Sequence, residues 1–149
     1  MRKSILVVDD DLFIRDITSH VLGVDNDILL AQDVENARNI IENKNVDLIL
    51  LDIKLEKESS ESLFDDIHQK KEKEIPVIVF SSNQDPIIKD NYIDHGIADY
   101  IQKPFNMNEL EIRIKDVLIQ DNPPKMQKKK DTFQFRRWLI NLIKFKKSA

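Results

Sequence analysis

Aspartates directly follow two short apolar stretches of this chain. Three consecutive aspartates, residues 9–11, come after residues 5–8, and Asp52 ends the apolar run of residues 48–51. Four large apolar residues in succession are typical of a strand buried on both faces of a parallel sheet. Ligands gather at the carboxyl ends of such strands. A carboxylate at that place can bind a cation or attack an electrophile, although Asp also ends strands simply as a turn residue.

These aspartates can act together only if the fold brings the ends of their strands close to one another. Apolar stretches of about five residues alternate with segments that repeat apolar residues every three or four positions. The expected strands are residues 4–8, 27–31, 47–51, 76–80 and 98–102, and the expected helices are residues 14–22, 34–41, 63–67, 86–95 and 107–118. Five such units predict an α/β fold whose parallel sheet is covered by helices on both faces. The expected arrangement is flavodoxin-like and doubly wound, with strand order 2-1-3-4-5 and five helices.

In that order the first and third strands are neighbours, so Asp9, Asp10 and Asp52 are expected to converge in one cleft. Ser81 and Lys103 follow the fourth and fifth strands and are expected at the same edge. Clustered carboxylates repel each other unless a cation intervenes, and oxygen ligands suit a hard ion such as Mg²⁺. Asp9 and Asp10 are therefore expected Mg²⁺ ligands beside Asp52. A carboxylate so placed can accept a phosphoryl group, with Lys103 and Ser81 stabilising the phosphoryl oxygens.

Four stretches of the sequence resemble the motifs of response-regulator receiver domains, the phosphoacceptor half of two-component signalling. They are the first strand with its acidic pair (5–11), the phosphoacceptor strand (50–52), the fourth strand with its switch serine (75–81) and the switch aromatic with the Lys-Pro pair (98–105). They stand in the family's order, and the resemblance extends over residues 2–120. Asp52 is therefore interpreted as a phosphoacceptor rather than a turn residue.

The resemblance implies a phosphorelay function. Asp52 would accept a phosphoryl group from a histidine kinase or a phosphotransfer protein, and the Mg²⁺ ion would be held by Asp9, Asp10, Asp52 and the backbone carbonyl of Lys54. The expected reactions are Mg²⁺-dependent self-phosphorylation and autodephosphorylation, without the turnover of an enzyme. The expected localisation is cytoplasmic.

The resemblance also implies how phosphorylation of Asp52 would change the surface of the domain. Lys103 would pair with the phosphoryl group, and the peptide bond before Pro104 would be cis. Ser81 would swing toward a phosphoryl oxygen and vacate space into which Tyr100 rotates. The surface formed by the fourth helix, fifth strand and fifth helix would then change its preference for a downstream protein partner, in a two-state equilibrium biased by phosphorylation.

The loop after the phosphoacceptor departs from the family pattern. Leu55 and Glu56 replace the usual Met-Pro pair, and Ser60 replaces a usual Gly. Ser82 replaces the Ala or Gly that often follows the switch serine. Without the Pro, this loop is expected to be more mobile. We hypothesise that the Lys54 side chain shields the acyl phosphate and lengthens its lifetime. The departures affect kinetics, because no chemical group of the site is lost.

Composition limits the other possibilities. The 149 residues contain no cysteine, which excludes disulfides and thiolate zinc sites, and only two glycines, which excludes the usual Gly-rich phosphate loops. No apolar run is long enough to span a bilayer, and the N-terminus does not resemble a signal peptide. Residues 125–149 carry a formal charge of +8 and residues 1–124 carry −12, which indicates an acidic domain with a basic tail.

The expected organisation is a receiver domain at residues 1–121, a Pro/Lys-rich linker at 122–131 and a basic amphipathic tail helix at 132–149. A helix with Trp and Phe on one face and Arg and Lys on the other suits a membrane surface, through residues 132–147, or the groove of a partner protein. Docking on the acidic domain of the same chain is a further alternative. Nucleic acid is not expected, because the tail is too short for a recognition fold.

Two other functions are alternatives to the phosphorelay switch. A hydrolase of the haloacid-dehalogenase-like kind would explain the Asp-x-Asp pattern formed by Asp9 and Asp11, but that family requires Thr or Val where Phe13 stands. A receiver-like module that binds proteins without being phosphorylated is the second. The presence of every expected catalytic group argues against this module.

Overall fold

The computed structural model of the chain describes residues 2–56, 58–69, 74–120 and 125–127. Five strands, β1 (Ser4–Val8), β2 (Asp27–Ala31), β3 (Leu48–Asp52), β4 (Val77–Ser81) and β5 (Asp99–Gln102), form one parallel sheet in the order β2-β1-β3-β4-β5. The helices are α1 (Leu12–Leu22), α2 (Val34–Asn43), α3 (Leu63–Gln69), α4 (Pro86–Asp94) and α5 (Met107–Leu118), and the 3-10 helix η1 (Ser60–Ser62) precedes α3. The predicted doubly wound fold is confirmed, whereas the predicted tail helix lies outside the described residues.

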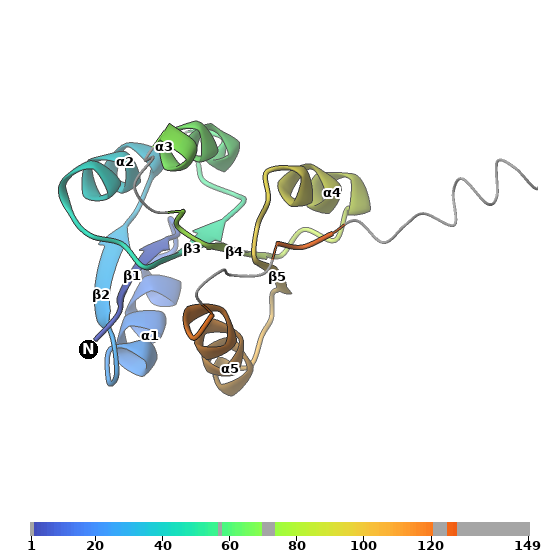
Figure 1. Cartoon of the computed structure of the whole chain (residues 1–149). Coiled ribbons are helices and arrows are strands. Elements are labelled where there is room, and N and C mark those ends of the chain that lie inside the picture. The colour runs from blue at the N-terminus through green and yellow to red at the C-terminus, as the bar shows by residue number, and fades with distance from the viewer. Residues whose placement is uncertain (1, 57, 70–73, 121–124, 128–149) are drawn as a thin grey trace, which may run out of the picture.

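Helices cover both faces of the sheet: α1 and α5 lie on one face, and α2, α3 and α4 lie on the other (Figure 1). Side chains alternate between the faces along each strand. In β1, for example, Leu6 and Val8 pack under α2, whereas Ile5 and Val7 pack in the cluster shared with α1 and α5. Because both faces are covered, all the strand residues of β3 and β4 are buried.

The register of the strands sets the position of the site. Val8 of β1 lies beside Leu51 of β3, Asp52 lies beside Phe80 of β4, and Ser81 lies beside Gln102 of β5. The residues that end these strands or follow them therefore lie at one edge of the sheet. Both β3 and β4 begin and end one residue later than the sequence pattern predicted.

Short polar side chains begin the helices. Asp11 caps α1 by accepting the backbone N–H of Phe13, and Asp85 caps α4 in the same way, with Pro86 at the first helical position. Gly96 follows α4 with φ +79°, a conformation that glycine adopts at little cost, so it ends the helix as predicted. The third aspartate of the triplet is thus a helix cap. Among the described residues, no helix is both long and apolar enough to cross a bilayer.

Residues 125–127 return to the opposite edge of the sheet. The backbone N–H of Met126 donates to the carbonyl of Ile97, 2.8 Å away, and the Met126 side chain packs against the core. The Lys125 ammonium pairs with Glu74. This part of the predicted linker is therefore attached to the domain at the amino ends of β4 and β5.

Candidate functional site

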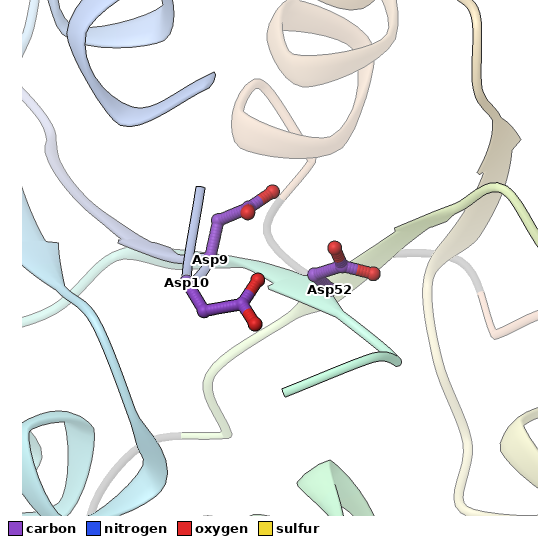
Figure 2. Close-up of side chains that lie close together, drawn as sticks. All are labelled: Asp9, Asp10 and Asp52. Carbon is purple, nitrogen blue, oxygen red and sulfur yellow. The ribbon is translucent and has the colours of Figure 1, made fainter. Parts of the chain in front are cut away.

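Three carboxylates meet where β1 and β3 end. Asp9 and Asp10 follow β1, and Asp52 is the last residue of β3 (Figure 2). One oxygen from each carboxylate lies within 4.8 Å of the others. Asp9 and Asp52 are 0% and 6% exposed, while Asp10 is half-buried. The convergence predicted from the strand order is therefore present in the structure, and this set of oxygen atoms could hold a hard divalent cation.

Lys103 extends from the end of β5 into this cluster. Its Nζ donates to Oδ2 of Asp52 at 2.7 Å and to Oδ2 of Asp9 at 2.8 Å. The ammonium also lies 4.6 Å from the centre of the Phe80 ring, a cation–π contact. The peptide bond between Lys103 and Pro104 is cis, as the family resemblance implied. Lys103 thus links the carboxylates of two neighbouring strands.

The charges of the cluster are not balanced. Burial raises the pKa of the Asp9 carboxyl, and hydrogen bonds from Lys103 and from the Asp11 backbone oppose that shift. Burial lowers the pKa of the Lys103 ammonium, but its hydrogen bonds to Asp52 and Asp9 outweigh burial, and its pKa is raised. Three carboxylates beside one ammonium leave an excess of negative charge. A bound cation would relieve the repulsion between these carboxylates.

Backbone groups orient the two buried carboxylates. The N–H of Lys54 donates to Oδ1 of Asp52 at 3.1 Å, and the N–H of Asp11 donates to Oδ1 of Asp9 at 2.9 Å. Arg15 on α1 donates to the carbonyl of Asp9 at 2.6 Å. In each buried carboxylate, Oδ1 therefore accepts a backbone N–H and Oδ2 accepts the Lys103 ammonium. The role of the Lys54 carbonyl as a metal ligand stays a prediction.

Ser81 and Tyr100 meet at the loop between β4 and α4. The Ser81 side chain is buried, and its Oγ accepts the backbone N–H of Asn83 at 3.0 Å. The Tyr100 hydroxyl donates to the carbonyl of Asn83 at 2.9 Å, and the residue is 9% exposed. Burial raises the pKa of the Tyr100 phenol, and a hydrogen bond with Ser81 opposes the shift. Both predicted switch residues thus hold the same backbone segment.

A groove of about 520 Å³ lies beside Tyr100, between α4, β5 and α5. Lys89 of α4 lies over the Tyr100 ring, 5.0 Å from its centre. On the other side Arg113 donates to Asp99 at 2.7 Å and to Glu109 at 2.8 Å. The groove therefore presents charged side chains around a buried phenol, on the surface predicted to contact a partner.

The loop after Asp52 contains contacts that the sequence did not indicate. The Ser60 side chain is completely buried, and its hydroxyl bonds to the Tyr92 hydroxyl at 2.7 Å. Glu58 pairs with Arg38 of α2, which also pairs with Asp66 of α3. In the sequence, Ser60 stands out only as a departure from the family pattern. That departure does not by itself indicate that the side chain is buried or that it contacts Tyr92.

Comparisons with known proteins agree with this geometry. Residues 5–115 match the response regulator receiver domain family. The chain is 32% identical over 124 residues to "Probable transcriptional regulator ycf27" of Cyanophora paradoxa, a match that covers 83% of this chain and 51% of the relative. It is 33% identical over 116 residues to the transcriptional regulatory protein KdpE of Staphylococcus aureus, covering 77% of this chain and 49% of the relative.

A solved structure is similar as well. The CheY-like response regulator receiver domain protein from Methanospirillum hungatei JF-1 superposes with a TM-score of 0.75 at 28% identity, covering 80% of this chain and 95% of that chain. This chain spans about half the length of the curated relatives it matches. The family match over residues 5–115 favours the receiver interpretation over the hydrolase alternative. The chain belongs to the response regulator receiver domain family of two-component signalling.

Proposed function

We propose that this domain is a phosphorylation switch in which Asp52 is the phosphoacceptor. The observation that carries the proposal is the Lys103 ammonium held between Asp52 and Asp9 at the carboxyl edge of the sheet. An oxygen of the Asp52 carboxylate attacks the phosphorus atom of a phosphohistidine on a kinase or phosphotransfer protein. The P–N bond breaks as the P–O bond forms, and the imidazole nitrogen keeps the electron pair. Lys103 is close enough to donate to the phosphoryl oxygens, where negative charge collects.

We propose Mg²⁺ as the cofactor. The carboxylates of Asp9, Asp10 and Asp52 supply oxygen atoms within 4.8 Å of one another, which suits a hard cation. The Lys54 carbonyl is the proposed backbone ligand. A bound Mg²⁺ ion would neutralise charge on the carboxylates and on the incoming phosphoryl group. The domain itself is proposed to be a substrate that is phosphorylated and dephosphorylated, not an enzyme with turnover.

The same proposal assigns the switch to Ser81 and Tyr100. The Ser81 hydroxyl now accepts the backbone N–H of Asn83, and we propose that it swings toward the phosphoryl group and donates to one of its oxygens. The Tyr100 hydroxyl donates to the carbonyl of the same residue, so a shift of this loop changes the position of the Tyr100 ring. Because that ring lines the groove between α4 and α5, phosphorylation would change the surface offered to a downstream protein.

Exposed apolar side chains mark where a phosphodonor protein is proposed to dock. Leu12 and Phe13, at the start of α1, are 61% and 67% exposed and directly follow the acidic residues of the site. Neighbouring exposed apolar side chains often belong to protein interfaces. A donor histidine that approaches Asp52 from this side would bring its protein against α1.

The deciding experiment is phosphorylation by a small-molecule donor. The full chain is incubated with Mg²⁺ and acetyl phosphate, and intact-mass spectrometry measures the addition of one phosphoryl group. Asp52→Asn removes the nucleophile while it keeps the shape of the side chain. We expect an adduct on the wild type and none on the variant. If neither acetyl phosphate nor a kinase modifies the folded wild type, the chain is instead a receiver-like module that binds proteins without phosphorylation.

The basic tail is a separate proposal, because residues 128–149 lie outside the described residues. Its positive charge and its apolar positions suit binding to three kinds of surface: the acidic domain of the same chain, a partner protein and an anionic membrane. Co-sedimentation with phosphatidylglycerol vesicles, comparing the full chain with one that ends at residue 127, tests the membrane. Retention of the full chain alone would add membrane association to the proposed cytoplasmic localisation.

A further inference from the structure

The peptide unit between Ile53 and Lys54, the second after the phosphoacceptor, has hydrogen-bond partners for both its N–H and its carbonyl. Its N–H, from Lys54, donates to Oδ1 of Asp52 at 3.1 Å, and its carbonyl, from Ile53, accepts the Ser60 hydroxyl at 3.3 Å. The N–H and C=O of a trans peptide point in opposite directions in one plane. Because both groups have partners, the rotation of this peptide plane is restricted, and the Lys54 amide stays directed at Asp52.

The Ser60 hydroxyl forms two hydrogen bonds, one with the Ile53 carbonyl and one with the Tyr92 hydroxyl, and its single hydrogen determines which group donates in each. A hydroxyl has one hydrogen and two lone pairs, so Ser60 can donate to Ile53 only if Tyr92 donates to Ser60. The two hydroxyl oxygens lie 2.7 Å apart, and both residues are almost completely buried, at 0% and 1% exposed. Burial at this level leaves little access for a water molecule that could replace either hydroxyl. The bonds therefore run from Tyr92 through Ser60 to the Ile53 carbonyl.

Tyr92 belongs to α4, the helix that also borders the partner groove. Its ring packs edge-on against Phe64 of α3, with ring centres 5.9 Å apart, which limits its movement. Burial raises the pKa of the Tyr92 phenol to about 12, so the phenol remains a donor at neutral pH. A movement of α4 would thus displace the donor of the Ser60 hydroxyl.

We propose that Ser60 and Tyr92 are positioning residues, which hold the Lys54 amide on the phosphoacceptor carboxylate and connect it mechanically to helix α4. The inference rests on the proposed function and adds a second connection between the site and α4, independent of the one through Ser81 and Tyr100. It assigns a role to the serine that occupies the usual glycine position of this loop. Ser60 and Tyr92 act through the peptide unit and do not touch the reacting atoms.

The test uses Ser60→Ala and Tyr92→Phe, each of which removes one hydroxyl and little else. Ser62→Ala is the matched control, because its hydroxyl lies in the same short helix but bonds to Glu58 and the Ser59 carbonyl. Nuclear magnetic resonance of the full, unphosphorylated chain follows the Lys54 amide proton and a titration with Mg²⁺. Urea unfolding shows separately that each variant folds.

We expect the chemical shift of the Lys54 amide proton to change in the direction that a weaker hydrogen bond produces. The change is expected in Ser60→Ala and, to a smaller extent, in Tyr92→Phe. Loss of a group that orients the residues around a metal typically weakens metal binding by about 10-fold or more, so Mg²⁺ affinity is expected to fall about tenfold in Ser60→Ala. Ser62→Ala is expected to match the wild type. Tyr92→Phe keeps the test valid if Ser60→Ala fails to fold.

The inference would be overturned if the folded variants had the same Lys54 amide chemical shift and the same Mg²⁺ affinity as the wild type. Failure of the proposed function is distinguishable, because it appears as a wild type that acetyl phosphate does not modify. The amide signal is measured without any phosphoryl group, so it decides the positioning role in either case.

Discussion

The Nζ of Lys103 lies 2.7 Å from Oδ2 of Asp52, although the two residues are 51 positions apart in the chain. If this ammonium stabilises the transferring phosphoryl group, Lys103→Met should slow phosphorylation by acetyl phosphate about 100-fold, the usual effect of losing one preorganised donor. The rate is measured by intact-mass spectrometry at several times. Lys115→Met is the control, because Lys115 lies away from the site and forms a surface ion pair with Asp25 at 3.9 Å. Equal rates for the two variants would remove Lys103 from the mechanism.

Mg²⁺ should stabilise the folded domain. A ligand that binds only the native state at 100 times its Kd adds about 2.7 kcal/mol to the free energy of unfolding. We expect the urea midpoint to rise with Mg²⁺ concentration in the wild type and to rise much less in Asp10→Asn. Asp116→Asn, a change on the exposed side of α5, should respond like the wild type. A midpoint that is independent of Mg²⁺ in the wild type would argue against the proposed cofactor.

The Lys54 side chain is exposed, while its backbone N–H holds Asp52. Lys54→Ala keeps the backbone group and removes the ammonium that we expect to shield the acyl phosphate from water. The phosphorylated form should therefore decay severalfold faster than the wild type after the donor is removed. Lys44→Ala, at the C-cap of α2, provides the comparison. Identical lifetimes for wild type and Lys54→Ala would end this hypothesis.

Docking of the donor protein can be separated from the chemistry. Phe13→Ser should reduce phosphotransfer from a cognate kinase about tenfold, because truncating a contributing interface residue costs more than about 1 kcal/mol and a tenfold change corresponds to about 1.4 kcal/mol. Its rate with acetyl phosphate should not change, since that donor needs no protein contact. Val24→Ser is a control on an equally exposed apolar residue beyond the other end of α1. A parallel fall with both donors would indicate damage to the site instead.

The buried Tyr92 phenol should make stability depend on pH in the alkaline range. Its folded pKa is about 12, above the ordinary value of 10.0, so the unfolded chain loses this proton first as the pH rises. The free energy of unfolding therefore falls between pH 10 and pH 12, by up to about 1.4 kcal/mol per pH unit. The raised pKa of Lys103 acts in the same direction above pH 10.5.

The difference between wild type and Tyr92→Phe isolates the phenol. The wild type should lose stability relative to this variant from pH 10 upward, as measured by urea unfolding at each pH. A constant difference across this range would mean that the phenol ionises equally easily in both states.

The residues at the strand ends could be predicted because their positions follow from periodicity and strand order. Asp9, Asp52 and Lys103 each follow or end a short apolar stretch, and a parallel sheet brings such positions to one edge. The bond between Ser60 and Tyr92 could not be predicted in this way. It joins a loop to a helix across 32 residues, and its geometry depends on how α3 and α4 pack.

The attachment of Met126 to Ile97 determines from which side of the domain the chain departs. Ile97 precedes β5, whereas Asp52 ends β3, and a strand of five residues spans about 16 Å at 3.3 Å per residue. Residues 125–127 therefore lie at the amino end of β5, at the edge of the sheet opposite the phosphoacceptor. Contacts made at these three residues would leave Asp52 accessible to an approaching kinase.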